Sequence, residues 1–268
     1  MLLTPLSDLN WAYQLHYYLC FRTRWRKQLL TSASAELLTT VSEICKTHDY
    51  HVLQSKCYSD QFRCVLSLHP SQTISACVQT IKANSTRMLG LKRLWERGFL
   101  AKSVGRMRIA AVSEYLRRQS EHHGYAQRLL PPVFRYRSQT PIKLSAAHSA
   151  FELTHHLVFA THYRVGVFTS TLGEALASYW LRVAAAREFA IDQISVVPDH
   201  VHLLVRTVPK LSIDRIALSL LNNGQFFIGK NFPRVLIATG LNQLWQPSAY
   251  AGTCGQVSTA LLKHWLSG

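Results

Sequence analysis

Acidic residues, long apolar runs and paired cysteines are all scarce in this sequence. Its 268 residues include 14 Asp and Glu against 30 Lys and Arg, which gives a formal net charge of +16. No apolar run reaches the ~18 residues of a membrane-spanning helix, and the first residues lack the basic and apolar stretches of a signal peptide. The six cysteines form no CxxC pair, which argues against a zinc site and a disulfide framework. We therefore expect a soluble cytoplasmic protein.

Apolar residues make up 48% of the chain and charged residues only 16%, a balance typical of a folded protein rather than a disordered basic tail. A net charge of +16 indicates a polyanionic partner. Nucleic acid is favoured, because no Lys-rich amphipathic helix or lipidation signal supports a membrane. The alternative is a basic surface that only aids solubility.

A long internal repeat divides the chain. Residues 12–26 align with residues 150–164, and six of these fifteen positions are identical. Residues 94–116 align with residues 244–266, again with six identities. Two such blocks in the same order predict a duplication.

The duplication predicts a first domain (1–124), a linker (125–149) and a second domain (150–268). Each domain alternates strand and helix patterns, which favours an α+β fold with an antiparallel sheet and helices on one face. The expected strands are 13–22, 57–68, 151–161 and 193–207, and the expected helices are 34–47, 73–89, 172–188 and 212–227. A final strand and helix close each domain.

The segment His200-Val201-His202 is the first candidate for chemistry. Side chains alternate along a strand, so Val201 would pack on the helices while both imidazoles lie on the open face of the sheet. Two imidazoles at that spacing can converge on one divalent cation. The alternative is an exposed pair without a ligand.

The second candidate is the expected helix 106–123. Tyr115 and Gln119 lie one turn apart on it and therefore side by side. Tyr115 is either a half-buried packing residue or a nucleophile whose phenolate oxygen attacks a phosphodiester. Gln119 would then supply a neutral oxygen ligand to a nearby cation.

Four segments together resemble the single-tyrosine HUH transposases of bacterial insertion sequences and their REP-associated relatives. They are THHLVFATHYR (154–164), VPDHVHLLV (197–205), LWERGF (94–99) and EYLRRQ (114–119). The resemblance implies a ferredoxin-like fold and cleavage and rejoining of single-stranded DNA hairpins through a 5′-phosphotyrosine with Mg²⁺ or Mn²⁺. It assigns metal binding to His200 and His202 with Gln119, and the nucleophile to Tyr115.

The two domains depart from that family pattern in complementary ways. Gln61 and Arg63 stand where the second domain has His200 and His202, and Trp265 stands where the first domain has Tyr115. Family members work as dimers in which one subunit's tyrosine helix can reach the other's histidines. The resemblance therefore implies an intrachain pseudo-dimer with one composite site, formed by Tyr115 and Gln119 of the first domain and the histidines of the second.

The sequence thus predicts a DNA transposase with one cutting site, which would need a second chain, two rounds or a simpler task to handle two DNA ends. Self-association into a dimer of pseudo-dimers is one such route. The alternative function is a domesticated protein that binds hairpin or single-stranded DNA without cutting it, although random loss of catalytic residues would then be expected in both domains.

Positive charge is concentrated in residues 1–138, which hold 20 basic and 8 acidic side chains against 10 and 6 in the remainder. This asymmetry predicts that the first domain holds most of the DNA. The expected phosphate contacts are Arg22, Arg24, Arg26, Lys27, Arg63, Arg87, Lys92 and Arg93. For Arg63, a solvated strand position is the alternative.

Overall fold

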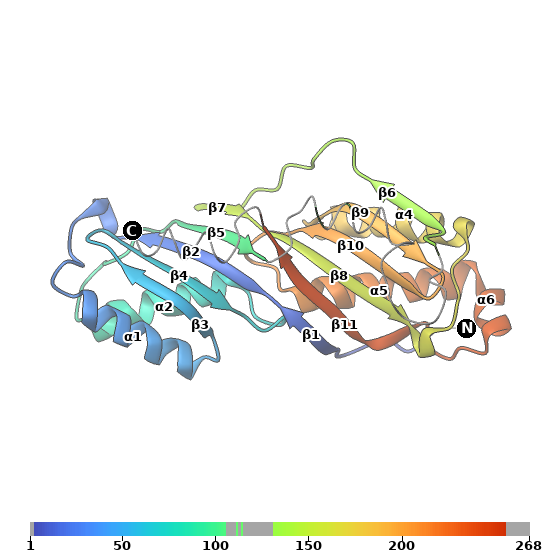
Figure 1. Cartoon of the computed structure of the whole chain (residues 1–268), viewed down its shortest axis with the longest axis horizontal. Coiled ribbons are helices and arrows are strands. Elements are labelled where there is room, and N and C mark those ends of the chain that lie inside the picture. Colours follow the sequence, from blue (N-terminus) through green and yellow to red (C-terminus); the bar gives the residue numbers. More distant parts are fainter. Residues whose placement is uncertain (1–2, 106–110, 112–113, 115–130, 256–268) are drawn as a thin grey trace.

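The computed structural model describes residues 3–105, 111, 114 and 131–255. The two halves of the chain lie one after the other along the long axis of an elongated molecule, and the strands β1 (Asn10–Gln14), β5 (Phe99–Val104), β7 (Ser149–Glu152) and β11 (Trp245–Cys254) meet between them (Figure 1). Each half is an α+β unit built around one sheet. None of the described helices is long and apolar enough to cross a membrane.

The first half contains a five-stranded sheet of order β3-β4-β2-β5-β7. Its elements are β2 (His16–Arg22), the 3-10 helix η1 (Arg24–Arg26), α1 (Ser34–Thr47), β3 (His51–Cys57), β4 (Gln61–Ser67), α2 (Ile74–Met88) and β5 (Phe99–Val104). The second half contains a six-stranded sheet of order β1-β11-β8-β10-β9-β6. Its elements are β6 (Phe134–Arg137), β8 (Thr154–Thr161), η2 (His162–Arg164), α4 (Ser170–Ala186), β9 (Ala190–Val197), β10 (His200–Arg206), α5 (Ile213–Asn231), α6 (Pro233–Thr239) and β11 (Trp245–Cys254).

The helices begin where the sequence places a capping hydroxyl. Thr73, Thr169 and Ser212 each accept a hydrogen bond from the backbone N–H three residues later, which satisfies a donor that the first turn otherwise leaves unpaired. Each helix buries one apolar stripe against its sheet, as Leu37 and Val41 do on α1. The predicted helix 34–47 is confirmed without change, and the other three predicted helices shift by one to four residues.

Two sequence predictions of the sheet were wrong in detail. The predicted strand 57–68 covers the turn and second strand of the hairpin β3–β4, and the predicted strand 193–207 covers parts of both strands of the hairpin β9–β10. The hairpins turn at residues 58–60 and at Pro198-Asp199, and apolar residues on both sides of these short turns hide the break in the pattern. Part of the predicted linker is also ordered, since β6 pairs with β9 as an edge strand.

The sheets are mixed rather than purely antiparallel, because the halves exchange one strand each. β1 (Asn10–Gln14) precedes β2 of the first sheet but pairs in parallel with β11 of the second. β7 (Ser149–Glu152) precedes β8 of the second sheet but pairs in parallel with β5 of the first. Each sheet therefore ends in a strand that belongs to the other half of the chain.

Two hydroxyl side chains join the halves at the exchange. Thr253 Oγ1 accepts a hydrogen bond from the backbone N–H of His16 at 3.0 Å and also donates to the carbonyl of Val104. Ser103 Oγ does the same in mirror order, accepting from the N–H of Thr154 at 3.1 Å and donating to the carbonyl of Cys254. Ser103 and Thr253 are equivalent in the repeat, so the junction has the symmetry of a homodimer interface.

Glycine permits this close approach. A Cβ atom at Gly105 would overlap the carbonyl oxygen of Thr253, and one at Gly255 would overlap the carbonyl oxygen of Ser103. On the helix side of the same junction, the Tyr17 hydroxyl and Nε2 of His155 share a buried hydrogen bond of 2.9 Å.

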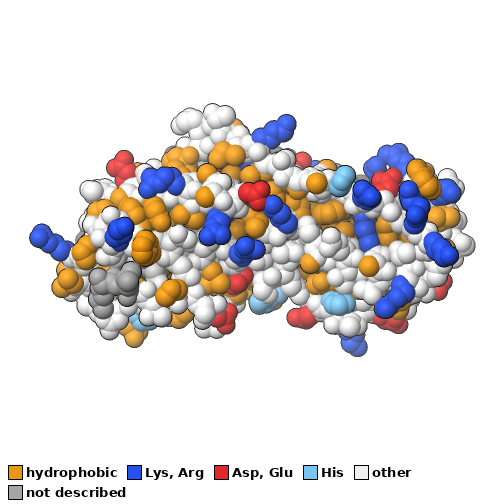
Figure 2. All heavy atoms as spheres, turned by 180° about the vertical axis from the view of Figure 1, so that it is seen from behind, with side chains coloured by type: hydrophobic (Ala, Val, Ile, Leu, Met, Phe, Trp, Pro, Cys, Tyr) orange, Lys and Arg blue, Asp and Glu red, His pale blue; other side chains and the backbone are white. Residues whose placement is uncertain are grey.

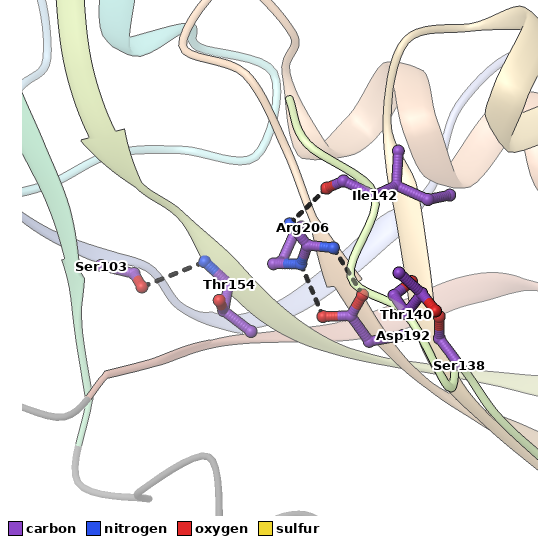
Figure 3. Close-up of polar contacts among 7 residues, drawn as sticks. All are labelled: Ser103, Ser138, Thr140, Ile142, Thr154, Asp192 and Arg206. Atoms are coloured by element: carbon purple, nitrogen blue, oxygen red, sulfur yellow. Dashed lines mark hydrogen bonds and ion pairs between the residues drawn. The ribbon is translucent and has the colours of Figure 1, made fainter. Parts of the chain in front are cut away.

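The segments that cross between the halves are tied down. Asn222 on α5 exchanges two hydrogen bonds with the backbone of Leu6, which leads into β1. Arg206, at the end of β10, makes a two-bond contact with Asp192 and donates to the carbonyl of Ile142 at 2.8 Å (Figure 3). The guanidinium of Arg206 thus attaches the segment that leads from Ile142 into β7 to the end of β10.

We expect Gly105→Ala to lower the free energy of unfolding by about 2 kcal/mol or more, because the added methyl group collides with backbone of the other half. Chemical denaturation measures the effect. Gly166→Ala is the matched control, since a Cβ there meets only Pro198 at an ordinary 3.6 Å. Equal stability of the two variants would contradict the close junction.

Burial at the junction also predicts a pH dependence. Burial lowers the pKa of His155 to about 3, so the unfolded chain takes up a proton below about pH 6.5 while the folded chain does not. Stability is therefore lost as the pH falls, by about 2 kcal/mol between pH 7 and pH 5 from this group. His155→Gln should lose about that much less over the same interval in urea unfolding, and an unchanged pH dependence would contradict the assignment.

Candidate functional site

The two histidines of the HUH motif lie on one face of β10. Val201, Leu203 and Val205 point to the helices and are fully buried, which confirms the predicted alternation. The rings of His200 and His202 occupy the opposite face, with centroids 4.8 Å apart. The prediction of an open face was wrong at His202, whose exposure is only 5%.

Each of the two rings uses Nδ1 in a hydrogen bond within the protein. His200 Nδ1 lies 2.6 Å from Oδ1 of Asp199, and His202 Nδ1 lies 3.0 Å from Nε2 of His156. Such contacts set the orientation of a ligating imidazole and make Nε2 the nitrogen that it would turn toward a cation. Burial lowers the pKa of His156 to about 4, so this ring is neutral at pH 7.

An ion pair between Arg164 and Asp199 holds the contact of Asp199 with His200 in place. Oδ2 of Asp199 accepts from Nε of Arg164 at 2.8 Å. Burial of the carboxyl would raise the pKa of Asp199, but the hydrogen bond from His200 and the charge of Arg164 outweigh it and lower that pKa. Asp199 is therefore a carboxylate, and its backbone carbonyl accepts from the hydroxyl of Thr161 at the base of η2.

His156, Asp199 and Arg164 were missed as functional residues by the sequence reasoning. All three lie within the quoted motifs, but the adjacent pair His155 and His156 gives no clear signal, because neighbouring residues on a strand face opposite ways and cannot share one cation. On β8 they do face opposite ways, His155 toward Tyr17 and His156 toward His202. The signal available was the acidic residue directly before the first histidine of the motif.

Strand pairing confirms which positions correspond in the first half. Arg22 and Cys20 on β2 pair with Gln61 and Arg63, just as Ala160 and Val158 on β8 pair with His200 and His202. The described strand β4 therefore carries no imidazole pair at these positions. Its Arg63 is half-buried, and the guanidinium lies 4.4 Å from the ring centre of Tyr58.

Tyr115 and Gln119 lie outside the described residues, so their assignment stays a prediction. Among the residues that are described, no three His, Cys, Asp or Glu side chains come together as a set that could hold a metal ion. His200 and His202 alone would give a cation only two ligands, so a further donor would have to complete such a site.

Most of the expected phosphate contacts gather at one end of the first half. Arg22 ends β2, and Arg24 and Arg26 belong to η1. The bridge between Thr23 and Trp95 brings this turn beside the segment that carries the expected contacts Lys92 and Arg93. Figure 2 shows Lys and Arg side chains collecting at this end of the molecule. The other two of the eight lie on regular elements, Arg63 on β4 and Arg87 in the last turn of α2.

Comparisons with known proteins match each half separately. The family described as Transposase IS200 like matches residues 11–119 and, a second time, residues 149–267. The ISDra2 transposase TnpA of Deinococcus radiodurans is 23% identical over 116 residues, which cover 43% of this chain and 83% of that protein. The transposase for insertion sequence element IS200 of Salmonella typhimurium is 23% identical over 122 residues, 46% of this chain and 80% of that protein.

Among solved structures, the REP-associated tyrosine transposase bound to a REP hairpin is 20% identical, with a TM-score of 0.31 over 37% of this chain and 62% of that one. Each relative thus corresponds to less than half of this chain. Two family matches in succession cover most of the sequence. The chain belongs to the IS200-like transposase family and carries the family's domain twice, in tandem.

Proposed function

We propose that this transposase cuts and rejoins single-stranded DNA at one composite active site. Tyr115 and Gln119 of the first domain would act together with His200 and His202 of the second. The observation that carries the proposal is the complementary loss of residues. Strand register puts Gln61 and Arg63 at the histidine positions of the first half, and the repeat puts Trp265 at the tyrosine position of the second.

His200 and His202 suit a divalent cation such as Mg²⁺ or Mn²⁺ because both rings are oriented through Nδ1. The amide oxygen of Gln119 would be the third ligand. When bound, the cation supplies positive charge that polarises the scissile phosphate and stabilises the leaving oxygen. The Asp199–Arg164 pair would keep the ring of His200 from rotating.

Tyr115 would act as the nucleophile. Its phenolate oxygen attacks the phosphorus, the bond from phosphorus to the 3′ oxygen breaks, and the released 3′ end takes up a proton. The 5′ end remains on the protein as a phosphotyrosine. The 3′-hydroxyl of another strand can then attack, lose its proton and release Tyr115 with the DNA rejoined.

The expected substrate is single-stranded DNA that carries hairpins, in line with the REP hairpin bound by one relative. The basic end of the first half would contact the phosphates, and the binding constant should fall steeply with salt. The alternative function is a protein that binds such DNA without cutting it. It is disfavoured because one full set of catalytic residues is kept between the two halves.

A single site would cut one strand at a time. Two DNA ends would then need two successive rounds, or a second chain in a dimer of pseudo-dimers. A nicking and resealing role needs neither.

The proposal predicts a covalent protein–DNA adduct. Incubation of the protein and Mn²⁺ with labelled single-stranded hairpin oligonucleotides from the DNA that flanks its gene should give a band that survives denaturing electrophoresis. Tyr115→Phe should abolish the band, because the attacking oxygen is gone, and His200→Ala should reduce it at least ~100-fold, because the cation loses a ligand.

Tyr250→Phe and Tyr125→Phe are the matched controls. Tyr250 lies beside the histidines, 5.8 Å from the ring of His156 between centroids, and is therefore the described tyrosine best placed to substitute for Tyr115. Both controls should keep the adduct. An adduct that persists in Tyr115→Phe would overturn the composite site.

A further inference from the structure

The turn η1 of the first half presents an aromatic ring to solvent. Trp25 is 68% exposed, although large apolar rings are normally covered. Its neighbour across the turn, Trp95, is half-buried, and its indole N–H donates to the Ser85 hydroxyl at 3.0 Å. The exposed ring is therefore not needed for the core.

The backbone holds Trp25 in this position against a conformational cost. Trp25 and Arg26 have φ angles of 57° and 51°, in the left-handed region that residues other than glycine rarely adopt. The turn is fixed by a hydrogen bond of 2.7 Å from the Thr23 hydroxyl to the carbonyl of Lys27, and by one of 2.8 Å from the Arg24 N–H to the carbonyl of Leu94. A strained and well-fixed exposed ring indicates a binding role.

Cations surround the ring. The Arg24 guanidinium lies 4.2 Å from the ring centre of Trp25, and the Lys27 ammonium lies 5.3 Å away. The ring borders a hollow of about 560 Å³ whose other lining residues are Arg24, Arg93, Trp95, Glu96 and Arg97. Within the described part of the chain, no carboxylate forms an ion pair with any of the three lining arginines.

The segment that carries the lining residues Glu96 and Arg97 is also held in place. Nζ of Lys82 on α2 donates to the carbonyls of Glu96 and Gly98 at 2.8 and 2.6 Å. The segment that carries Arg97 is thereby fixed to a helix, so the hollow is formed before any ligand arrives.

The equivalent turn of the second half is built differently. Tyr163 is 78% exposed and has a φ of 53°, so the exposed aromatic ring and its strain are kept. The cations are not kept, because His162, Gln243 and Pro247 occupy the places of Arg24, Arg93 and Arg97 in the repeat. The one arginine of this turn, Arg164, is paired with Asp199 and supports His200.

We infer that the hollow around Trp25 binds an unpaired nucleotide of single-stranded DNA. The base stacks on the indole, and the flanking phosphates contact Arg24, Arg93 and Arg97. Single-stranded DNA matches both features at once, since aromatic rings stack bases and unpaired arginines contact the backbone. The inference rests on the proposed function and adds a subsite to it, placed in the half that lacks the histidine pair.

Equilibrium binding of a fluorescein-labelled oligothymidine without metal tests the subsite independently of cleavage. Trp25→Ala should weaken binding about tenfold or more, because one stacking contact is lost, whereas Trp25→Phe should keep most of the affinity. Tyr163→Ala is the matched control and should change the affinity less than about twofold. Arg93→Gln combined with Arg97→Gln should make the negative slope of log K against log salt shallower by about 1.4, for two lost phosphate contacts.

Unchanged affinity in Trp25→Ala, or an equal loss in Tyr163→Ala, would overturn the subsite. Neither result would affect the adduct experiment, which is read at saturating DNA. Conversely, the wild-type protein could form no adduct while Trp25→Ala still weakens DNA binding as expected. That result would refute the cutting site and leave the nucleotide subsite standing.

Discussion

The contact between residues 103–105 and residues 253–255 determines how the two halves sit together. The hydroxyls of Ser103 and Thr253 each form hydrogen bonds with the backbone of the opposite half. Gly105 and Gly255 let the two backbone segments approach to van der Waals contact. Both exchanged strands end beside this junction, β1 at Gln14 and β7 at Glu152, so their pairing with the opposite half depends on it. The histidine strand and the basic turn of the other half are consequently fixed relative to one another within one chain.

A covalent pair of domains relaxes a constraint that a homodimer cannot escape. In a homodimer every substitution appears twice, whereas here each half can change alone. The turn after β2 and the turn after β8 illustrate the result. Both keep an exposed ring on a strained backbone, yet one lies beside three arginines that form no ion pair with any described carboxylate, and the other gives its arginine to Asp199 beside the histidine pair.

Local patterns predicted much of this structure because local physics decides it. Helix α1 follows from its apolar stripe, and the burial of Val201 opposite His200 follows from strand alternation. The duplication and the family were also readable, since whole motifs survive in both halves. The strand β6 within the predicted linker was harder to predict, because its described strand partner is β9, far along the chain.

Long-range partners account for the rest of what was missed. Nothing in residues 10–14 signals that they pair with residues 248–252 of the other half. His156 contacts His202 because two strands align in one particular register, and a single sequence does not state that register. The burial of His202 has the same origin.

The central claim is that one chain provides both parts of the active site. Mixing Tyr115→Phe protein with His200→Ala protein tests it directly, with wild-type protein as the positive control for the covalent DNA adduct. Each variant lacks a different part, so an intrachain site predicts no more adduct in the mixture than in either variant alone. Restoration of the adduct in the mixture would show that the tyrosine and the histidines come from different chains, and would contradict the account.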